Sequence, residues 1–453
     1  MNGNLTEGKI GTTLIKFAMP YLLAAFMQTF YGMADLMIVG LFNTASTTSA
    51  VAIGSQIMHM LTVIILGFAM GTTVHVGRCV GAKDKDGASK IVANSLYFFT
   101  AFAIVITAVL LICTRGIVKV MSTPPEAVTE AKEYLYICFI GLPFIIAYNV
   151  ISSIFRGAGD SKRPMYFVAV ACIVNIILDF AFIGGLGLGA KGAALATVFG
   201  QAVSVIVSLF SLKRIDLNFS ISLKDEKPDK DSILKILNVG TPVALQDGFI
   251  QIAFIVITII ANSRGLIDAA SVGIVEKIIC FIFLVPSAFL SAISAITAQN
   301  LGAGQMIRAK KSLYYGLIIT VSWGIVVAIY CQFMPHTLVC LFTKEEPVLL
   351  AGCEYLRSYC FDATFAAVHF CFSGFFCGIE KSRLSFIHNL ASVLLVRIPG
   401  TYFLSESFKN TLYPMGFAAP LGSLLSAVMC VCFYLYIKDD IGKSSINITG
   451  FEK

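Results

Sequence analysis

Charged residues are scarce in this chain. Only 13% of its 453 residues are Asp, Glu, Lys or Arg, whereas 57% are hydrophobic. A soluble globular domain has about 25% charged and about 45–50% apolar residues. The shortage of charge therefore excludes an ordinary water-soluble domain. It predicts a protein whose partner is the lipid bilayer.

Motifs that bind metals or form disulfide frameworks are also missing. The thirteen cysteines lie mostly in apolar runs, with no C-x-x-C pair and no His–Cys ligand spacing. We interpret them as small hydrophobic side chains, and we expect no metal site of this kind. The N-terminal residues are polar, and no apolar core follows a basic start, so we expect no cleaved signal peptide. The five histidines are scattered, and we expect them to be ordinary core side chains.

What the chain has instead is a series of long apolar runs. A transmembrane helix needs about 20 mainly apolar residues, and twelve runs of roughly this length or longer occur along the sequence. They predict an all-α polytopic membrane protein with six helices in each half. The expected spans are 13–40, 47–76, 90–113, 133–155, 164–185, 190–212, 232–261, 270–298, 312–335, 349–376, 384–405 and 413–437.

Three landmarks occur twice, about 221 residues apart. A period this long indicates two homologous halves rather than a solenoid, and membrane proteins built from such halves commonly enclose a central pathway. The landmark pairs are Pro20 with Pro242, Gly81-Ala82-Lys83 with Gly302-Ala303-Gly304, and Phe155-Arg156-Gly157 with Phe376-Cys377-Gly378.

The repeat and one polar interruption predict the domain organisation. We expect an N-terminal six-helix lobe over 1–212 and a C-terminal six-helix lobe over 232–437. A charged, turn-rich linker over 213–231 would join them, and 438–453 would form a tail.

Basic residues predict the orientation in the membrane. Cytoplasmic loops of membrane proteins carry an excess of Lys and Arg. With the N-terminus inside, most basic residues of this chain fall on inside connections, including the linker and the tail. We therefore expect both termini in the cytoplasm, in the plasma (inner) membrane. Topology accounts for the net charge of +7, and no nucleic-acid partner is needed to explain it.

Polar side chains inside the N-terminal spans indicate a functional site. Asp35 shares a helical face with Gln28 and Tyr31, while Asn175 and Asp179 are four residues apart in the fifth span. Ionisable groups within a membrane are rare and usually functional. Two such acids in a low-dielectric pocket suit a proton near neutral pH, or a sodium ion. The alternative is that the acids cap helix ends or line a water pocket without taking part in turnover.

The C-terminal half lacks these acids. The repeat offset places Val256, Val396 and Gly400 at the positions of Asp35, Asn175 and Asp179, so the expected ion site is confined to the N-terminal half. Other polar residues do occur in the C-terminal spans. We expect Arg397 to pair with one of the acids there. These acids are Asp247, Glu276 and Asp362.

An ordered set of motifs resembles the multidrug and toxic compound extrusion (MATE) transporters from residue 13 to residue 437. Each motif alone is modest, but their order along the chain is specific. They are Pro20 to Gln28, Tyr31, Asp35 to Gly40, Gly71 to Asp84, Arg156 to Asp160, Asn175 to Asp179, Gly187 to Thr197, and Gln299 to Gly304.

The resemblance implies two pseudo-symmetric six-helix lobes arranged in a V around a central cavity. It also implies antiport by alternating access, in which small organic, often cationic, compounds leave as protons or sodium ions enter. The family's cation site falls here on Asp35, Asn175 and Asp179. Its neighbouring polar and substrate-cavity positions fall on Gln28, Tyr31, Asn149 and Thr197.

The chain departs from the sodium-driven branch of that family in its C-terminal half. Gln251 lies near the position of the branch's seventh-helix Glu, and Ala366 lies where its tenth-helix Asp is expected, one turn after Asp362. This departure favours proton coupling through the N-terminal lobe, although sodium at Asp35 and Asp179 remains an alternative. We expect no cofactor besides the coupling ion, and a functional monomer.

Three other functions are open on sequence grounds. A lipid or lipid-linked oligosaccharide flippase of the same superfamily should have a cavity richer in arginine, whereas this chain offers chiefly Arg397. A membrane-embedded prenyltransferase is the enzyme alternative, because the spacing of Asn175 and Asp179 could hold magnesium and diphosphate. Such an enzyme needs a second acid-rich motif, which is absent. A channel is disfavoured because the chain has no filter-like loop.

Overall fold

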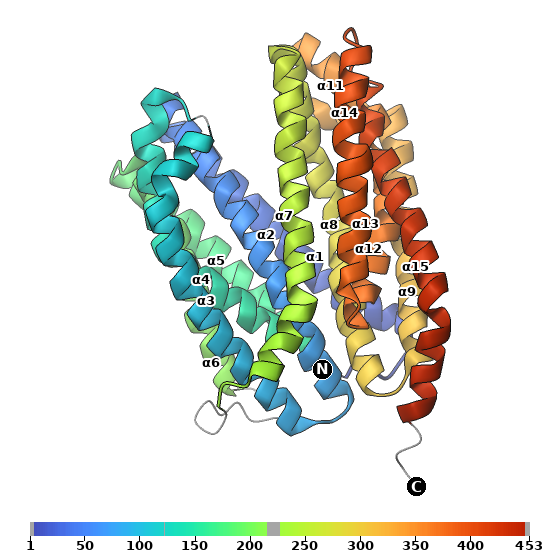
Figure 1. The fold of residues 1–453 in the computed structure, drawn as a ribbon. Helices are drawn as coiled ribbons and strands as arrows, with labels where there is room; N and C mark the ends of the chain where they lie inside the picture. The colour runs from blue at the N-terminus through green and yellow to red at the C-terminus, as the bar shows by residue number, and fades with distance from the viewer. Residues whose placement is uncertain (1–3, 122, 215–226, 449–453) are drawn as a thin grey trace. The chain divides into compact units, whose positions relative to one another are not determined.

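The chain is built from helices that follow the predicted spans (Figure 1). The structure, a computed structural model, describes residues 4–121, 123–214 and 227–448, and within them all regular structure is helical. The helices of the N-terminal half are α1 (Ile10–Phe42), α2 (Ala45–Gly81), α3 (Lys85–Val120), α4 (Val128–Gly157), α5 (Lys162–Asp179) and α6 (Gly189–Arg214). A 3₁₀ turn, η1 (Pro125–Ala127), precedes α4, and a π-helical turn, η2 (Phe180–Gly185), follows α5.

The C-terminal half has the same order with more interruptions. Its helices are α7 (Lys230–Ser263), α8 (Leu266–Gly302), α9 (Met306–Phe333), α10 (Pro335–Val339), α11 (Glu346–Tyr359), α12 (Asp362–Gly378), α13 (Ser382–Ser392), α14 (Ile398–Ser407) and α15 (Ala418–Ile448). A π-helical turn, η3 (Val393–Arg397), joins α13 to α14, and a 3₁₀ turn, η4 (Met415–Phe417), precedes α15. Most of the predicted linker lies outside the described residues, and the predicted tail is helical as far as Ile448.

The expectation of an all-α protein with twelve spans is confirmed. Among the described residues, eleven helices are long and apolar enough to cross a membrane when adjoining turns are counted with them, and the pair α11 and α12 makes a twelfth. One of the expected spans is bent. The run 349–376 is not one straight helix, because α11 and α12 meet at a 45° bend. Hydropathy could not reveal the bend, since the break at Cys360 and Phe361 contains neither proline nor glycine.

The repeated loops have the same backbone geometry in both halves. Lys83 and Gly304 both adopt a positive φ, of 58° and 70°, at positions 221 residues apart. At each loop the next amide reaches back to a helical carbonyl, from Asp84 to Cys79 and from Gln305 to Asn300. These bonds are typical of a helix that ends in a left-handed residue. The loops after the third landmark pair behave likewise, with positive φ at Gly159 and Glu380, which are also 221 residues apart.

The chain divides into two compact units. Unit 1 contains Met19–Gly240, and unit 2 contains Asn4–Ala18 together with the chain from Thr241 onward. In unit 1 the central helix is α4, which packs against α2, α3 and α6. In unit 2 the equivalent helix is α12, which packs against α8, α9 and α15. The two halves of the sequence repeat thus have the same pattern of helix packing.

Two helices are divided between the units. The first turns of α1 belong to unit 2, where Leu14 and Phe17 lie in its apolar core, and the rest of α1 belongs to unit 1. The first turns of α7 belong to unit 1, where Ile236 is part of the core, and the rest of α7 belongs to unit 2. Pro20 and Pro242 lie inside these helices, and each is the second residue of the new unit.

The start of each divided helix is fixed by polar contacts inside one unit. In unit 1 the Asp229 carboxylate pairs with the Lys90 ammonium at 3.0 Å, and the Asp229 amide donates to the Asn94 side chain at 2.6 Å. In unit 2 the Leu5 amide donates to the Gln299 side chain at 3.0 Å, and the Arg308 guanidinium donates to the backbone of Glu7 and Gly8.

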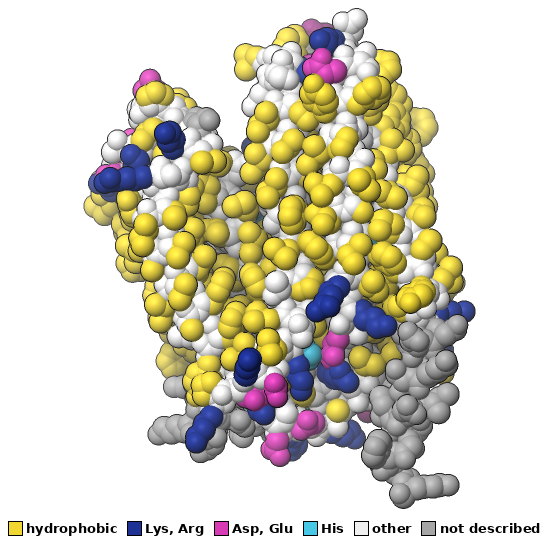
Figure 2. Space-filling model, viewed as in Figure 1, with side chains coloured by type: hydrophobic (Ala, Val, Ile, Leu, Met, Phe, Trp, Pro, Cys, Tyr) yellow, Lys and Arg dark blue, Asp and Glu magenta, His cyan; other side chains and the backbone are white. Residues whose placement is uncertain are grey.

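The outer surface matches a bilayer environment. Large apolar side chains such as Ile112 and Leu266 are more than four-fifths exposed. On the visible face, hydrophobic side chains cover the helices along most of their length, and charged side chains gather toward the helix ends (Figure 2). Exposed apolar area on this scale is typical of contact with lipid rather than water.

Candidate functional site

The polar residues predicted in the N-terminal spans converge inside unit 1. Asp35 on α1, Asn175 on α5 and Asp179 at the end of α5 are each at most 3% exposed. Asp35 and Asp179 lie close enough for the charge of Asp35 to act on Asp179. The fold thus brings the first and fifth spans together at the expected carboxylates.

The local backbone explains how α5 presents its two polar side chains. Asn175 and Asp179 are one helical turn apart and share a face. Gly200 on α6 packs against this turn, since a Cβ there would lie 3.2 Å from the Asn175 Cβ. Directly after Asp179 the helix widens into the π-helical turn Phe180–Gly185. Such turns are rare and frequently mark functional sites.

Several polar atoms of this acid cluster are buried without a hydrogen bond to another described residue. The Thr197 hydroxyl donates to the Asp35 Oδ2 atom at 3.3 Å. Among the described residues, Asp35 Oδ1, both Asp179 carboxylate oxygens and both amide atoms of Asn175 are buried without a hydrogen bond. Native proteins leave few buried polar atoms unpaired, and each one calls for an explanation. A bound proton, cation or water would supply the missing partner.

Neither acid forms an ion pair with a basic side chain of the described residues. The site therefore offers several oxygens and no counter-charge, which suits a proton or a hard cation. The titratable side chains whose charges interact with Asp35 are Asp179 and Cys172 on α5, Tyr134 and Cys138 on α4, and Tyr31 on its own helix.

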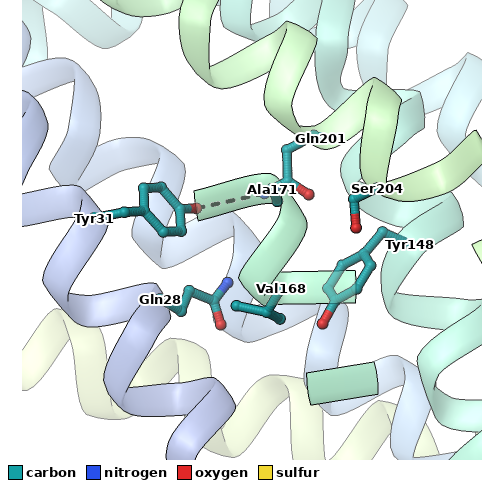
Figure 3. Close-up of a pocket in the computed structure, with 7 residues that line it drawn as sticks. All are labelled: Gln28, Tyr31, Tyr148, Val168, Ala171, Gln201 and Ser204. Carbon is teal, nitrogen blue, oxygen red and sulfur yellow. Dashed lines mark hydrogen bonds between the residues drawn. The ribbon is translucent and has the colours of Figure 1, made fainter. Parts of the chain in front are cut away.

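A small recess lies next to the acid cluster, also inside unit 1 (Figure 3). Gln28 and Tyr31 from α1 face Gln201 and Ser204 from α6, and the Gln201 amide donates to the Tyr31 hydroxyl at 3.4 Å. The other lining residues are Tyr148, Val168 and Ala171. The recess carries amide and phenol groups but no charged side chain.

Sequence reasoning missed three polar residues of this recess. Gln201 and Ser204 continue the face of Thr197 at spacings of four and seven residues, the same pattern that led to Asp35. That spacing was the available signal. Tyr148 had no comparable signal, because tyrosine is common in apolar spans.

Asn149 is not hydrogen-bonded to the acid cluster. It is buried on α4, and its amide donates to the Ile145 carbonyl of the same helix at 2.8 Å. It makes no hydrogen bond to either acid.

Unit 2 contains a buried ion pair instead of an acid cluster. The Arg397 Nη2 atom lies 3.3 Å from the Asp362 Oδ2 atom and donates to the Ser423 hydroxyl at 2.6 Å. The expected pairing of Arg397 with an acid is thus confirmed. Gly422 leaves room for the arginine, because a Cβ there would lie 2.5 Å from the Arg397 Cγ.

The other polar positions of unit 2 lie outside this pair. Gln251 is half-buried on α7 and makes no side-chain hydrogen bond to another described residue. Glu276 on α8 accepts from the Thr258 hydroxyl at 3.5 Å, and Asp247 accepts from Gln246 at 3.4 Å. Within the described residues, no group of His, Cys, Asp and Glu is arranged to hold a metal ion.

Comparison with known proteins decides the family. The model of the MatE family matches residues 20–181 and 242–403, one match in each half. The chain belongs to the MATE family of transporters. Among its relatives are the "Probable multidrug resistance protein YpnP" of Bacillus subtilis (strain 168), 27% identical over 96% of each chain, and the "Multidrug export protein MepA" of Staphylococcus haemolyticus (strain JCSC1435), 23% identical over 95% of this chain and 93% of the relative.

Solved MATE structures have the same fold. A crystal structure of MATE in the bent conformation matches with a TM-score of 0.92, and one in the straight conformation with 0.91. Each is 23% identical in sequence and covers 98% of this chain and 99% of the other. As a MATE protein the chain is a multi-pass membrane transporter rather than an enzyme, which removes the prenyltransferase alternative.

Proposed function

We propose that this MATE protein exports lipophilic, often cationic, drugs or metabolites in exchange for an inward flow of cations, and that the coupling ion is a proton. The observation that carries the proposal is the acid cluster of unit 1. It combines two buried carboxyl groups, unpaired oxygens and the absence of a basic partner among the described residues. The names of the relatives, which refer to multidrug resistance and export, support the substrate class.

In the proposed cycle, the proton and the cationic substrate compete for the negative charge of Asp35 and Asp179. When the site faces outward, Asp35 takes up a proton and the charge of the cluster falls. α1, which contains Pro20, then bends or shifts, and the substrate is released. When the site faces inward the proton leaves, and the ionised Asp35 and Asp179 again favour a lipophilic cation.

One proton supplies enough energy for useful export. An elementary charge that crosses a potential of 100 mV yields about 2.3 kcal/mol. If each exchange moves one net charge, this energy supports a substrate gradient of about 50-fold.

The ion pair of unit 2 supports a proton rather than sodium. Asp362 is the acid closest in sequence to the position where the sodium-driven branch has its tenth-helix Asp. Here its carboxylate already faces the Arg397 guanidinium. An acid held by arginine is a poor ligand for a second cation, which leaves the cluster of Asp35, Asn175 and Asp179 as the proposed ion site.

The distribution of Lys and Arg supports the proposed setting. We place the protein in the plasma (inner) membrane with both termini in the cytoplasm, and we propose that it works as a monomer.

Transport by inside-out vesicles tests the proposal. The vesicles carry an imposed pH gradient, acid inside, and the readout is gradient loss after addition of ethidium or norfloxacin. Wild type is compared with Asp35→Asn, first in potassium and then in sodium medium. We expect substrate-triggered proton release from wild type in both media and none from Asp35→Asn.

Two other results would change the proposal. Release that is unchanged in Asp35→Asn would remove the central role of Asp35. No response of wild type in either medium would contradict drug–proton exchange and favour a flippase or another substrate.

A further inference from the structure

Four of the thirteen cysteines lie in one short stretch of unit 2, between the end of α9 and the bend of the tenth span. Cys331 belongs to the last turn of α9, and Cys360 directly follows α11 at the break before α12. Cys340 and Cys353 lie between them in the sequence. All four are free thiols in the structure. Their contacts show which of them are neighbours.

The contacts pair Cys331 with Cys360. The two side chains form a thiol–thiol hydrogen bond, and both are fully buried (0% exposed). The Cys360 sulfur also contacts both sides of Cys331 on α9. It lies 3.8 Å from the Ala328 carbonyl oxygen and 3.4 Å from the Gln332 side-chain nitrogen. The two sulfurs are therefore neighbours, although they belong to different helices.

α9 contacts the tenth span on each side of its break. Gly324 and Cys331 are seven residues apart on α9 and so share a helical face. At Gly324 the two backbones are close, since a Cβ there would lie 2.6 Å from the Ala363 carbonyl oxygen in the first turn of α12. At the end of α9, the Gln332 amide donates to the Arg357 carbonyl in the last turn of α11. A bond between α9 and the break would thus act at the centre of this contact.

The other half of the repeat has neither the thiols nor the break. The offset of 221 residues places Leu110 at the position of Cys331 and Phe139 at the position of Cys360. α4 continues as a regular helix through Phe139, whereas the tenth span bends by 45°. The thiol pair therefore occurs in the half whose central helix is interrupted.

We propose that Cys331 and Cys360 are a disulfide-forming pair, and that their bond fixes the bend between α11 and α12 to the end of α9. Exposure to an oxidant rests on the proposed function, in whose orientation α9 begins in the cytoplasm and ends on the outer side. Disulfides form at cell surfaces and in other oxidising locations, and they are rare in the cytosol. Because both thiols are enclosed, they are oxidised while unit 2 folds or when the bend opens.

The reaction needs a disulfide oxidant and no other co-reactant. The attacking species in thiol–disulfide exchange is a thiolate. Of the two sulfurs, that of Cys360 has the N–H donor of Gln332 beside it. Cys360 attacks the oxidant and releases one thiol, and Cys331 then attacks the Cys360 sulfur and releases the second. Two S–H bonds are lost, one S–S bond forms, and the protons pass to the two thiols made from the oxidant.

Locating the free thiols of the purified protein tests the pairing. Full-length protein in lipid nanodiscs is prepared without reductant, and half of it is incubated with oxidised glutathione. Each sample is then unfolded in N-ethylmaleimide, which labels every free thiol, and is digested for mass spectrometry. We expect two fewer labelled cysteines in the oxidised sample than in protein reduced with dithiothreitol, and a cross-linked peptide that joins Cys331 to Cys360.

The effect on the bend is measured on the same samples. Hydrogen exchange of residues 355–366 reports on local opening at the break. We expect this exchange to be several-fold slower in the oxidised protein than in the reduced protein. The midpoint of thermal unfolding should also rise by about 3 °C or more on oxidation.

Three variants complete the design. Cys331→Ser and Cys360→Ser should each abolish the cross-link and the change of the unfolding midpoint, and either one suffices if the other folds poorly. Cys371→Ser is the matched control. Cys371 on α12 is also fully buried against α9, but its partner is the Thr320 hydroxyl at 3.2 Å rather than a thiol. This variant should keep both the cross-link and the change of the midpoint.

Three results would overturn the proposal. The first is the absence of a Cys331–Cys360 cross-link both before and after oxidation. The second is a cross-link of Cys340 with Cys353 in its place. The third is a Cys331–Cys360 bond that leaves the exchange of 355–366 unchanged, since the bond would then not fix the bend. None of these measurements involves transport, so their failure is distinct from a failure of drug–proton exchange in the vesicles.

Discussion

Asp362 and Arg397 place two opposite charges inside an apolar helical unit. Taking both charges out of water carries a large desolvation penalty, and their attraction offsets it only when both are present. We expect Asp362→Asn or Arg397→Met alone to destabilise the protein by about 3–5 kcal/mol. The combined replacement Asp362→Leu with Arg397→Met should recover most of this loss. The midpoint of thermal unfolding in detergent measures both effects.

An exposed pair of unit 2 is the control for this prediction. Lys409 and Glu406 are 3.1 Å apart, with side chains 72% and 52% exposed. Lys409→Met should change stability by less than about 1 kcal/mol. If the buried and exposed replacements had equal effects, burial would not be the reason for the stability of the Asp362–Arg397 pair.

Single residues also show what the sequence could and could not reveal about the site. The spacing of Gln28, Tyr31 and Asp35 predicted a shared face, and the structure places the acids of α1 and α5 together. That Arg397 would pair with an acid followed from its charge in an apolar span. Which acid it would pair with depended on the packing of η3 against α15 and on the reach of the Arg397 side chain to Asp362 at the start of α12, which no local pattern encodes.

Helix ends and bends were the least predictable features of the elements. The second span was expected over 47–76, but α2 runs from Ala45 to Gly81. Hydropathy detects only the part of a helix that crosses hydrocarbon, whereas backbone hydrogen bonds continue beyond it. α3 shows the same effect, because it begins at charged Lys85 with Asp84 as its N-cap, five residues before the expected span.

The start of α7 gives a prediction about pH. The pKa of Asp229 is lowered to about 2, first by the hydrogen bond from the Ser232 hydroxyl and then by Lys90. An acid with a depressed pKa stabilises the fold above its ordinary pKa, near 4, and this contribution is lost as the pH falls toward 2. We expect hydrogen-exchange protection of 230–240 to fall several-fold over that range.

Replacement of the carboxylate should mimic the effect of acid. Asp229→Asn should lower the protection of this segment at pH 7 and abolish the loss between pH 4 and pH 2. Asp231→Asn is the matched control, because Asp231 is exposed two residues further on and has no salt bridge among the described residues. A wild-type profile in Asp229→Asn would show that the Lys90 and Ser232 contacts do not hold the start of α7.

At the scale of the whole molecule, the repeat was predictable and the division of helices was not. Paired motifs such as Gly81-Ala82-Lys83 and Gly302-Ala303-Gly304 predicted two homologous halves. In the structure, α4 and α12 are the equivalent central helices of the two units. A repeat aligns positions in sequence, but it does not state which unit each turn packs into. The first turns of α1 and α7 pack with the half to which they do not belong in sequence.

The divided helices predict the behaviour of a split transporter. Expressed alone, fragment 1–220 would lack the turns of α7 that complete unit 1 and would contain turns of α1 without their partners. We expect either fragment alone to be degraded and both together, 1–220 with 221–453, to restore ethidium export. A stable fragment 1–220 that resists protease to the same extent as the intact chain would contradict this expectation.

The packing of the segment from Leu5 to Phe17 into unit 2 has a consequence for biosynthesis. Leu5, Leu14 and Phe17 are synthesised well before Phe289, Ile296 and Leu313, yet all six lie in one apolar core. At about 5–20 residues per second, a ribosome needs roughly 15–60 seconds to reach those partners. During that time the first turns of α1 lack their native neighbours from α8 and α9. The segment from Leu5 to Phe17 can therefore reach its native packing only after the chain has been synthesised beyond Leu313.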